Sequence, residues 1–306
     1  MGTKLRFWKR DRNVFKSLFS KGIMFYEEVK RVFLHIRWPV QIAMLLGFFA
    51  GSIVGDIHYS PEILRGFISW FLIWASVTLF NSYYDKDETS VIGLKHPPKV
   101  GKSLLYTAIL FKLLGFLIAL TLSRVYLVFY IIYIGLSVTY SHKFFRFKSN
   151  GYIALLYNFI NGMYVFIIPS TLAVPVDYGA VILAGIGAGF YSVATYIFTQ
   201  LHQTKEDTGR GDFSIASRYG IEKASIVSFL LMILSVPFVL YALYSRALTG
   251  LFYFMAFFFT FVILVYFYLI RKHLEKFKSF DLLNNFISYS NYLAIVVMIY
   301  FYIMMH

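Results

Sequence analysis

Apolar residues in this chain gather into long, almost uninterrupted stretches. A helix that crosses the hydrocarbon core of a bilayer needs about 20 mostly apolar residues. Stretches close to this length predict nine membrane-spanning helices in a single all-α bundle, at residues 39–55, 62–84, 103–122, 124–140, 151–174, 178–201, 224–244, 250–270 and 283–304. The first stretch is short, and an extension backwards through Arg37 and Trp38 would lengthen it.

The first 38 residues have a different pattern, in which basic and apolar residues are mixed. Residues 13–36 place Phe, Leu, Ile and Val at helical spacing among Lys, Glu and Arg. This pattern predicts either an interfacial helix on the anionic cytoplasmic leaflet or a helix packed against the bundle. The charges also interrupt the apolar run that a signal peptide would need. We therefore divide the chain into a cytoplasmic N-terminal segment, 1–38, and a membrane domain, 39–306.

Composition supports a membrane protein. Hydrophobic residues make up 59% of the chain and charged residues only 14%, whereas soluble proteins contain about 45–50% apolar and about 25% charged residues. A soluble enzyme and a disordered protein are thereby excluded. The chain has no Cys, which excludes disulfides, thiolate catalysis and cysteine-ligated zinc.

The net charge of +14 would suggest a nucleic-acid partner in a soluble protein, but its distribution fits membrane topology better. All but four of the 29 Lys and Arg residues lie before the first predicted span or in every second loop. The four exceptions are Arg65, Lys112, Arg124 and Arg246. Because cytoplasmic loops collect basic residues, we expect a multi-pass protein of the cell membrane with a cytoplasmic N-terminus, an external C-terminus and no nucleic-acid partner.

The acidic residues cluster at the ends of two predicted spans. Six of the 15 follow span 2 or span 6: Asp85, Asp87, Glu88, Glu206, Asp207 and Asp212. Asn81 lies one helical turn before Asp85, so both share a helix face. The predicted topology places both groups on the cytoplasmic side. Carboxylate and amide oxygens suit Mg²⁺, which often bridges to substrate phosphates, although ordinary solvated loop charge would give the same pattern.

Cations follow span 4. Arg146 and Lys148 are donors suited to phosphate oxygens, although the positive-inside rule also accounts for them. Acids on two loops and cations on a third predict a metal–diphosphate site at the cytoplasmic mouth of an apolar bundle. The substrate so implied has an anionic head and an apolar tail.

These motifs resemble the UbiA superfamily of intramembrane prenyltransferases. Asn81-Ser-Tyr-Tyr-Asp85 is similar to the first Asp-rich motif, in the form seen in menaquinone-type members. The stretch from Gln203 through Asp207 to Ser214 is similar to the second, with Gln203 in place of its first Asp. Tyr140, Ser141, Arg146 and Lys148 match the stretch after the fourth helix, and Lys95-His-Pro-Pro98 resembles a basic, proline-rich loop.

The resemblance implies Mg²⁺-dependent transfer of an isoprenyl group from an isoprenyl diphosphate to a lipophilic or aromatic acceptor, within membrane lipid. It implies catalytic roles for Asn81, Asp85 and Asp207 and metal ligands among Asn81, Asp85, Glu88, Gln203 and Asp207. Expected substrate-binding residues are Tyr140, Arg146, Lys148, Asp87, Asp212, Lys95, Lys112, Asn158 and Arg37.

Several alternatives stay open. Lys112 lies near the middle of span 3, where a charged side chain is costly. Its ammonium group could face the substrate cavity, snorkel towards the membrane surface or form a structural hydrogen bond. Asn158 and Asn161 in span 5 line the cavity or join helices. Within the same family, the alternative reaction is transfer to geranylgeranylglyceryl phosphate in ether-lipid synthesis. An organic-anion transporter is the alternative from another class, but transporters usually place their polar groups near mid-membrane.

Overall fold

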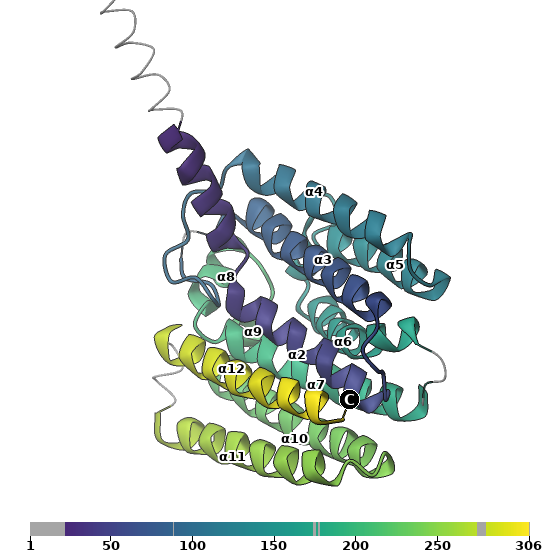
Figure 1. The fold of residues 1–306 in the computed structure, drawn as a ribbon. Helices are drawn as coiled ribbons and strands as arrows, with labels where there is room; N and C mark the ends of the chain where they lie inside the picture. Colours follow the sequence, from purple (N-terminus) through teal and green to yellow (C-terminus); the bar gives the residue numbers. More distant parts are fainter. Residues whose placement is uncertain (1–21, 88, 174–175, 177, 274–279, 306) are drawn as a thin grey trace, which may run out of the picture.

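The computed structural model describes residues 22–87, 89–173, 176, 178–273 and 280–305. These residues form helices and contain no strands, only two isolated bridges. A helix at Gly22–His35 projects from a bundle of long helices (Figure 1). The bundle comprises α2 (Trp38–Val54), α3 (Pro61–Asp85), α4 (Lys102–Ala119), α5 (Arg124–Ser141), α6 (Gly151–Ile167), α7 (Tyr178–Gln200), α10 (Ile221–Ser245), α11 (Thr249–His273) and α12 (Phe280–Met305). Short elements are η1 (Phe147–Ser149), η2 (Ile168–Leu172), α8 (Thr204–Arg210) and α9 (Ile215–Tyr219).

Each predicted span corresponds to one of these long helices, with ends that differ by a few residues. Among the described residues, seven helices are individually long and apolar enough to cross a membrane: α3, α4, α5, α6 with η2, α7, α10 and α11. The helix Gly22–His35 and α2 meet the criterion only together, and α12 contributes a shorter apolar stretch, Ser288–Met304. The all-α polytopic fold is therefore confirmed, while the number of nine spans and their orientation stay predictions.

The suggested extension of the first span is confirmed for Trp38, the first residue of α2, but the helix is interrupted at Arg37. Arg37 has a left-handed backbone (φ 58°) and precedes the first residue of α2, Trp38. Proline is tolerated in the first turn of a helix, where its missing N–H has no partner to lose, and Pro39 occupies that turn. The helix Gly22–His35 meets α2 at an angle of 48°. Most of its apolar side chains are exposed, including Phe25 at 73%, whereas Val32 is partly buried against the bundle.

Small residues allow the inner helices to pack closely. A Cβ atom added at Gly51 of α2 would lie 2.0 Å from the carbonyl oxygen of Phe166 in α6. A Cβ atom at Gly187 of α7 would lie 2.9 Å from the carbonyl oxygen of Ser235 in α10. Close contact of this kind is how membrane helices associate without a hydrophobic driving force. The glycines of α7 therefore allow close helix packing.

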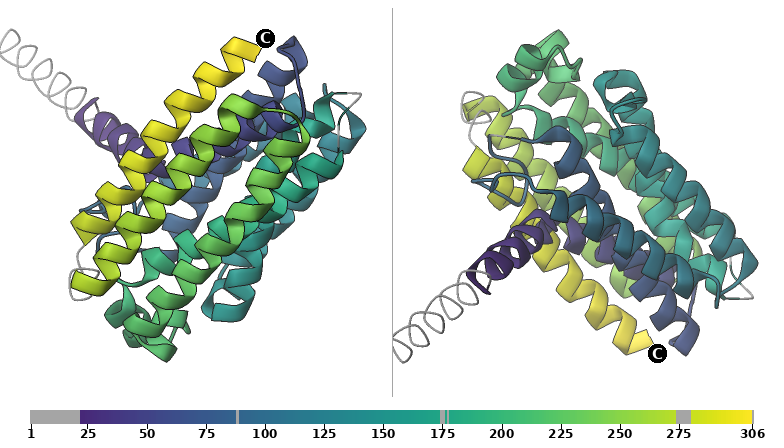
Figure 2. Two further views of the ribbon diagram at one scale, coloured as in Figure 1. Left: turned by 90° about the horizontal axis from the view of Figure 1, so that it is seen from below. Right: turned by 90° about the horizontal axis from the view of Figure 1, so that it is seen from above.

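The polar connections gather at one end of the bundle. The end of α3, the loop between α5 and α6, and α8 with α9 lie there, whereas α12 ends at the opposite end (Figure 2). The backbone N–H of Phe213 donates to the carbonyl of Ser149 at 3.0 Å, so the loops before α6 and after α8 touch. We call this end the mouth.

Candidate active site

The last turn of α3 supplies the first acidic group. Asn81 and Asp85 lie one turn apart, and Lys86, with a left-handed backbone (φ 51°), ends the helix directly afterwards. The Ser141 hydroxyl at the end of α5 donates to Asn81 Oδ1 at 2.9 Å. This bond leaves the second lone pair of the amide oxygen for another partner.

The connection between α5 and α6 places two cations beside the acids. Lys148 forms an ion pair with Asp85, and their side chains are only 14% and 7% exposed. Arg146 Nη2 donates to both carboxylate oxygens of Asp212, at 2.8 and 3.1 Å. The loop between α5 and α6 therefore contacts both acidic segments. Its backbone also contacts the loop after α8, through the hydrogen bond between Phe213 and Ser149.

The second acidic group lies on and beside α8. The Thr89 hydroxyl donates to Glu206, which joins the loop after α3 to α8. The His202 imidazole lies 3.1 Å from the carbonyl of Ser90 in the same loop. Burial lowers the pKa of His202, and its hydrogen bond to that carbonyl opposes the shift. The two acidic segments are thus tied together directly, although they lie more than 100 positions apart in sequence.

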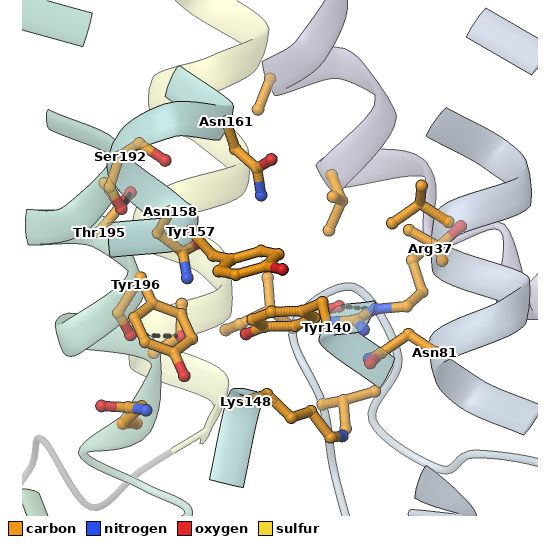
Figure 3. Close-up of a pocket in the computed structure, with 18 of the residues that line it drawn as sticks. Arg37, Asn81, Tyr140, Lys148, Tyr157, Asn158, Asn161, Ser192, Thr195 and Tyr196 are labelled. Atoms are coloured by element: carbon orange, nitrogen blue, oxygen red, sulfur yellow. Dashed lines mark hydrogen bonds between the residues drawn. The ribbon is translucent and has the colours of Figure 1, made fainter. Parts of the chain in front are cut away.

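A cavity of about 360 Å³ opens between these segments and extends among the helices. Its polar lining includes most of the residues that the sequence singled out: Arg37, Asn81, Asp85, Asp87, Tyr140, Lys148, Asn158, Asn161, Gln203, Glu206, Asp207 and Asp212. Figure 3 shows Tyr140 of α5, Asn158 of α6 and Arg37, which directly precedes α2, approaching the same space. The cavity is charged towards the mouth and bordered by hydroxyl, amide and aromatic groups inside.

Arg37 is the cation nearest the first turn of α2. Its Nε donates to the carbonyl of Ile92 at 2.8 Å. Burial lowers the pKa of the guanidinium, and the nearby carboxylate of Asp87 opposes this effect. Arginine nevertheless stays charged in proteins, so Arg37 gives the cavity lining a fixed positive charge.

Three of the predicted site residues that the structure describes do not line the cavity. Lys95 pairs with Asp281 of α12 at 2.7 Å, and Arg146 contributes only through its contact with Asp212. The ammonium group of Lys112 lies 4.0 Å from the centroid of the Phe80 ring. Glu88 lies outside the described residues.

The sequence analysis missed several residues that line the cavity. Ser192, Thr195 and Tyr196 form one face of α7 at helical spacing, and Tyr157 packs against Tyr140 with ring centroids 5.3 Å apart. Tyr196 and Tyr140 interact through their hydroxyl groups. The helical spacing of these polar residues within an apolar stretch could have predicted that they share one face of α7. Tyrosine gave no such indication, because the chain contains 25 tyrosines.

The donor set suits a hard divalent cation. Asn81, Asp85, Gln203 and Asp207 offer oxygen atoms, as Mg²⁺ prefers. Among the described residues, however, no three His, Asp or Glu side chains gather closely enough to hold a metal ion. These side chains can therefore supply only part of the coordination sphere of Mg²⁺. Phosphate oxygens and water would supply the rest, as is usual for Mg²⁺ in sites that bind phosphates.

The fold is a helical membrane bundle, and its cavity has acidic and basic groups at the mouth and aromatic groups inside. This combination is typical of membrane-embedded enzymes whose substrate has an anionic head and an apolar tail. The family comparison is specific: residues 40–290 match the UbiA prenyltransferase family, and the chain belongs to that family. It is therefore a prenyltransferase. No curated protein matches the sequence.

Solved structures share the fold at low sequence identity. A UbiA homologue from Archaeoglobus fulgidus bound to GPP and Mg²⁺ has a TM-score of 0.64 and 16% identity, over 87% of this chain and 99% of that one. A UbiA homologue from Aeropyrum pernix K1 has a TM-score of 0.65 and 14% identity, over 84% and 97%. A digeranylgeranylglyceryl phosphate synthase has a TM-score of 0.57 and 17% identity, over 89% and 99%.

Proposed function

We propose that this chain transfers an isoprenyl group from a Mg²⁺-bound isoprenyl diphosphate to an aromatic acceptor of the quinone-precursor kind. The observation that carries the proposal is the placement of both acidic segments and Lys148 around one cavity. The Archaeoglobus fulgidus homologue, solved with DMAPP and with GPP, each together with Mg²⁺, supports the donor and the metal.

The metal would be held by Asn81 and Asp85 on one side of the mouth and by Gln203 and Asp207 on the other, with Glu88 as a further candidate. When bound, Mg²⁺ neutralises the charge of the diphosphate and makes it a better leaving group. Lys148 would contribute N–H donors to the phosphate oxygens, since charge-assisted bonds of this kind are short and strong, and Arg146 would act through Asp212, which it holds at the cavity. Asp87 and Asp212 would complete the charged rim.

Transfer begins when the bond between the allylic carbon and the diphosphate oxygen breaks and its electron pair leaves with the diphosphate. The carbon that remains is electron-deficient, and water would quench it. Tyr140, Tyr157 and Tyr196 line the cavity, where their rings would exclude water and could favour a cation through the negative charge of an aromatic face. A ring carbon of the acceptor then forms the new bond, and the ring loses a proton.

Arg37 and Asn158 are the proposed contacts of the acceptor. Arg37 lines the cavity and keeps its positive charge. Because guanidinium binds carboxylate and phosphate groups in a bidentate way, it favours an acceptor that carries an acid group. Asn158 donates to the carbonyl of Ala154 at 2.8 Å, which leaves its carbonyl oxygen to accept from a hydroxyl group.

Transfer to geranylgeranylglyceryl phosphate is the second candidate. The fold similarity to a digeranylgeranylglyceryl phosphate synthase favours it, and a phosphate group would also suit Arg37. An organic-anion transporter has less support, because the family is one of transferases and the charged residues gather at one end of the bundle.

The test is a product assay in proteoliposomes. Purified protein receives labelled geranylgeranyl diphosphate, Mg²⁺ and in turn dihydroxynaphthoate, hydroxybenzoate or geranylgeranylglyceryl phosphate. We expect a prenylated aromatic product, identified by mass spectrometry. A product only with the glyceryl phosphate would select the second candidate, and diphosphate uptake without any product would favour transport.

A further inference from the structure

The helix Gly22–His35 lies outside the part of the chain that matches the family, which begins at residue 40. It leaves the side of the bundle near the mouth, across the direction of the long helices (Figure 2). One face of the helix is attached to the bundle. Val32 packs against the apolar cluster of α3 and α4, and the Ser103 hydroxyl at the start of α4 donates to Glu28.

Another face of this helix is apolar and exposed. Phe25, Val29 and Phe33 follow one another at intervals of four residues and are 73%, 50% and 53% exposed. Side chains four residues apart lie on the same face of a helix, so these three form a continuous stripe, which we call the outer stripe. Large apolar side chains that gather on one exposed face mark a binding surface.

The outer stripe continues onto the outer surface of the bundle. The ring centroid of Phe33 lies 5.4 Å from that of Trp38, and the Trp38 ring lies 6.0 Å from that of Phe71 in α3. α3 is apolar enough to cross a membrane, and Ile68, one turn before Phe71, is 41% exposed. Tryptophan concentrates where the membrane meets water. The aromatic contacts therefore join the outer stripe to a surface that faces lipid.

The charge of the preceding sequence favours an anionic partner. Residues 1–21 contain seven Lys and Arg residues and one Asp. Basic residues beside an apolar helix face are typical of segments that bind anionic lipid headgroups. A second copy of the chain would bring like charge to this region, whereas an anionic lipid surface brings the opposite charge. Continuity with the bundle and charge thus point to the same occupant.

The end of the helix is fixed to the mouth through three consecutive residues. His35 Nε2 lies 3.1 Å from the carbonyl of Pro98, in the loop before α4. The carbonyl of Ile36 accepts a hydrogen bond from the Thr78 hydroxyl of α3 at 3.1 Å. Arg37 follows with a left-handed backbone (φ 58°), which a residue with a side chain rarely adopts unless its surroundings hold it there. A change in the direction of the helix would therefore move Arg37.

From these observations we propose that the helix Gly22–His35 binds an anionic lipid surface through the outer stripe, and that this contact holds Arg37 in position at the cavity. The effect on transfer rests on the proposed function, in which Arg37 binds the acceptor. The outer stripe enters the region of the acyl chains, and the basic segment before it meets the headgroups. The lipid composition of the membrane then regulates the enzyme through the position of Arg37.

The first test measures the lipid contact and requires no turnover. Because the chain has no Cys, Val29→Cys and Glu27→Cys each give one site for the fluorophore NBD. Glu27 is the matched control, since it is exposed on another face of the same helix. The variants are placed in vesicles of phosphatidylcholine and phosphatidylglycerol that contain a lipid with a nitroxide near the carbonyl end of its acyl chain. We expect the nitroxide to quench the fluorophore at position 29 several-fold more than at position 27. Equal quenching at the two positions would overturn the proposal.

The second test measures regulation by lipid. Phe25→Ser with Val29→Ser removes most of the outer stripe, and Glu27→Ser with Lys30→Ser is the control, because both of its positions are exposed on the same helix and the net charge is kept. Transfer is measured in phosphatidylcholine vesicles with and without phosphatidylglycerol. Wild type and control should be several-fold faster with the anionic lipid, and the stripe variant should lose this difference.

The stripe variant should also have a raised KM for the aromatic acceptor and an unchanged KM for geranylgeranyl diphosphate, because Arg37 is the group that moves. The same response to phosphatidylglycerol in the stripe variant as in wild type would overturn the proposal and leave the proposed function standing. Absence of transfer by wild type in every vesicle would instead defeat the proposed function, and the quenching experiment would still decide whether the helix binds lipid.

Discussion

Lys148 and Asp85 form an ion pair in which both side chains are largely buried, although one follows α5 and the other ends α3. A buried charge whose partner is removed is strongly destabilising, by about 3–5 kcal/mol. Lys148 is also the proposed hydrogen-bond donor to the diphosphate, and Asp85 is a proposed metal ligand. The pair therefore holds the mouth together and presents both charges to the substrate.

Removal of Lys148 should affect both stability and activity. We expect Lys148→Met to lower the melting temperature and to reduce kcat/KM for the isoprenyl diphosphate at least 100-fold, because one charge-assisted contact is lost and Asp85 is left buried. Lys143→Met is the matched control, since Lys143 lies in the same loop and is exposed. Addition of Asp85→Asn to Lys148→Met should restore part of the stability but not the activity; simple additivity of the two effects on stability would contradict the pairing.

Replacement of Gln203 tests the proposed metal ligands. Gln203→Asp adds a negative charge to the oxygen donors of the mouth, and we expect it to lower the Mg²⁺ concentration for half-maximal transfer several-fold. Chelation should abolish wild-type transfer, and added Mg²⁺ should restore it. A Mg²⁺ titration curve identical to that of wild type would place Gln203 outside the ligand set.

Substitutions of Tyr140 distinguish the contribution of its hydroxyl group to catalysis from that of its aromatic ring. Tyr140 interacts with Tyr196 and Asn158 through its hydroxyl group. We expect Tyr140→Phe to lower kcat about tenfold and Tyr140→Ala to lower it much further, because a desolvated cation–π contact is worth about 2 kcal/mol. Tyr241→Phe, on an exposed position of α10, should be neutral. Equal losses in the Phe and Ala variants would exclude a role for the ring.

Lys112 provides a contrasting prediction. Its ammonium group has no hydrogen-bond partner among the described residues and lies over the Phe80 ring, outside the cavity. Because an unpaired charge inside a membrane helix is costly, Lys112→Met should keep transfer within about twofold of wild type and should not lower the melting temperature. A large loss of kcat/KM with unchanged stability would contradict this prediction and would show that Lys112 takes part in substrate binding.

The absence of Cys allows the predicted topology to be tested with single cysteines. Phe144 lies in the loop after α5, 81% exposed, and Tyr59 lies in the loop after α2, 66% exposed. In right-side-out vesicles, a membrane-impermeant maleimide should label Tyr59→Cys directly and Phe144→Cys only after permeabilisation. The reverse pattern would contradict a cytoplasmic mouth.

The sequence predicted the helices well because long apolar stretches have few alternative structures in a membrane. It also predicted the convergence of Asn81, Asp85 and Asp207, since the charges of a polytopic protein collect at helix ends. It could not show that Lys95 reaches Asp281, 186 positions away, or that Lys112 lies over Phe80. Such pairings depend on which helices are neighbours and how each is rotated, and a single sequence does not contain that information.

The same limit explains the missed residues. Thr195 and Tyr196 belong to an apolar helix, and only the rotation of α7 brings them to the cavity. A second, apolar cavity, which adjoins the site at Tyr191 and Asn291, could not be predicted either, because its lining does not differ in composition from lipid-facing surfaces. Polar residues at helix ends could be predicted, whereas the interior of the site required the packing of the bundle.

Coupled release of inorganic diphosphate and prenylated product from geranylgeranyl diphosphate and an aromatic acceptor is the most direct measurement of the central claim. Wild type should release one diphosphate for each product formed, and only with Mg²⁺ present. Asp85→Asn and Asp207→Asn should each lose at least 100-fold in rate while they remain folded. Undiminished turnover in both variants would contradict the account.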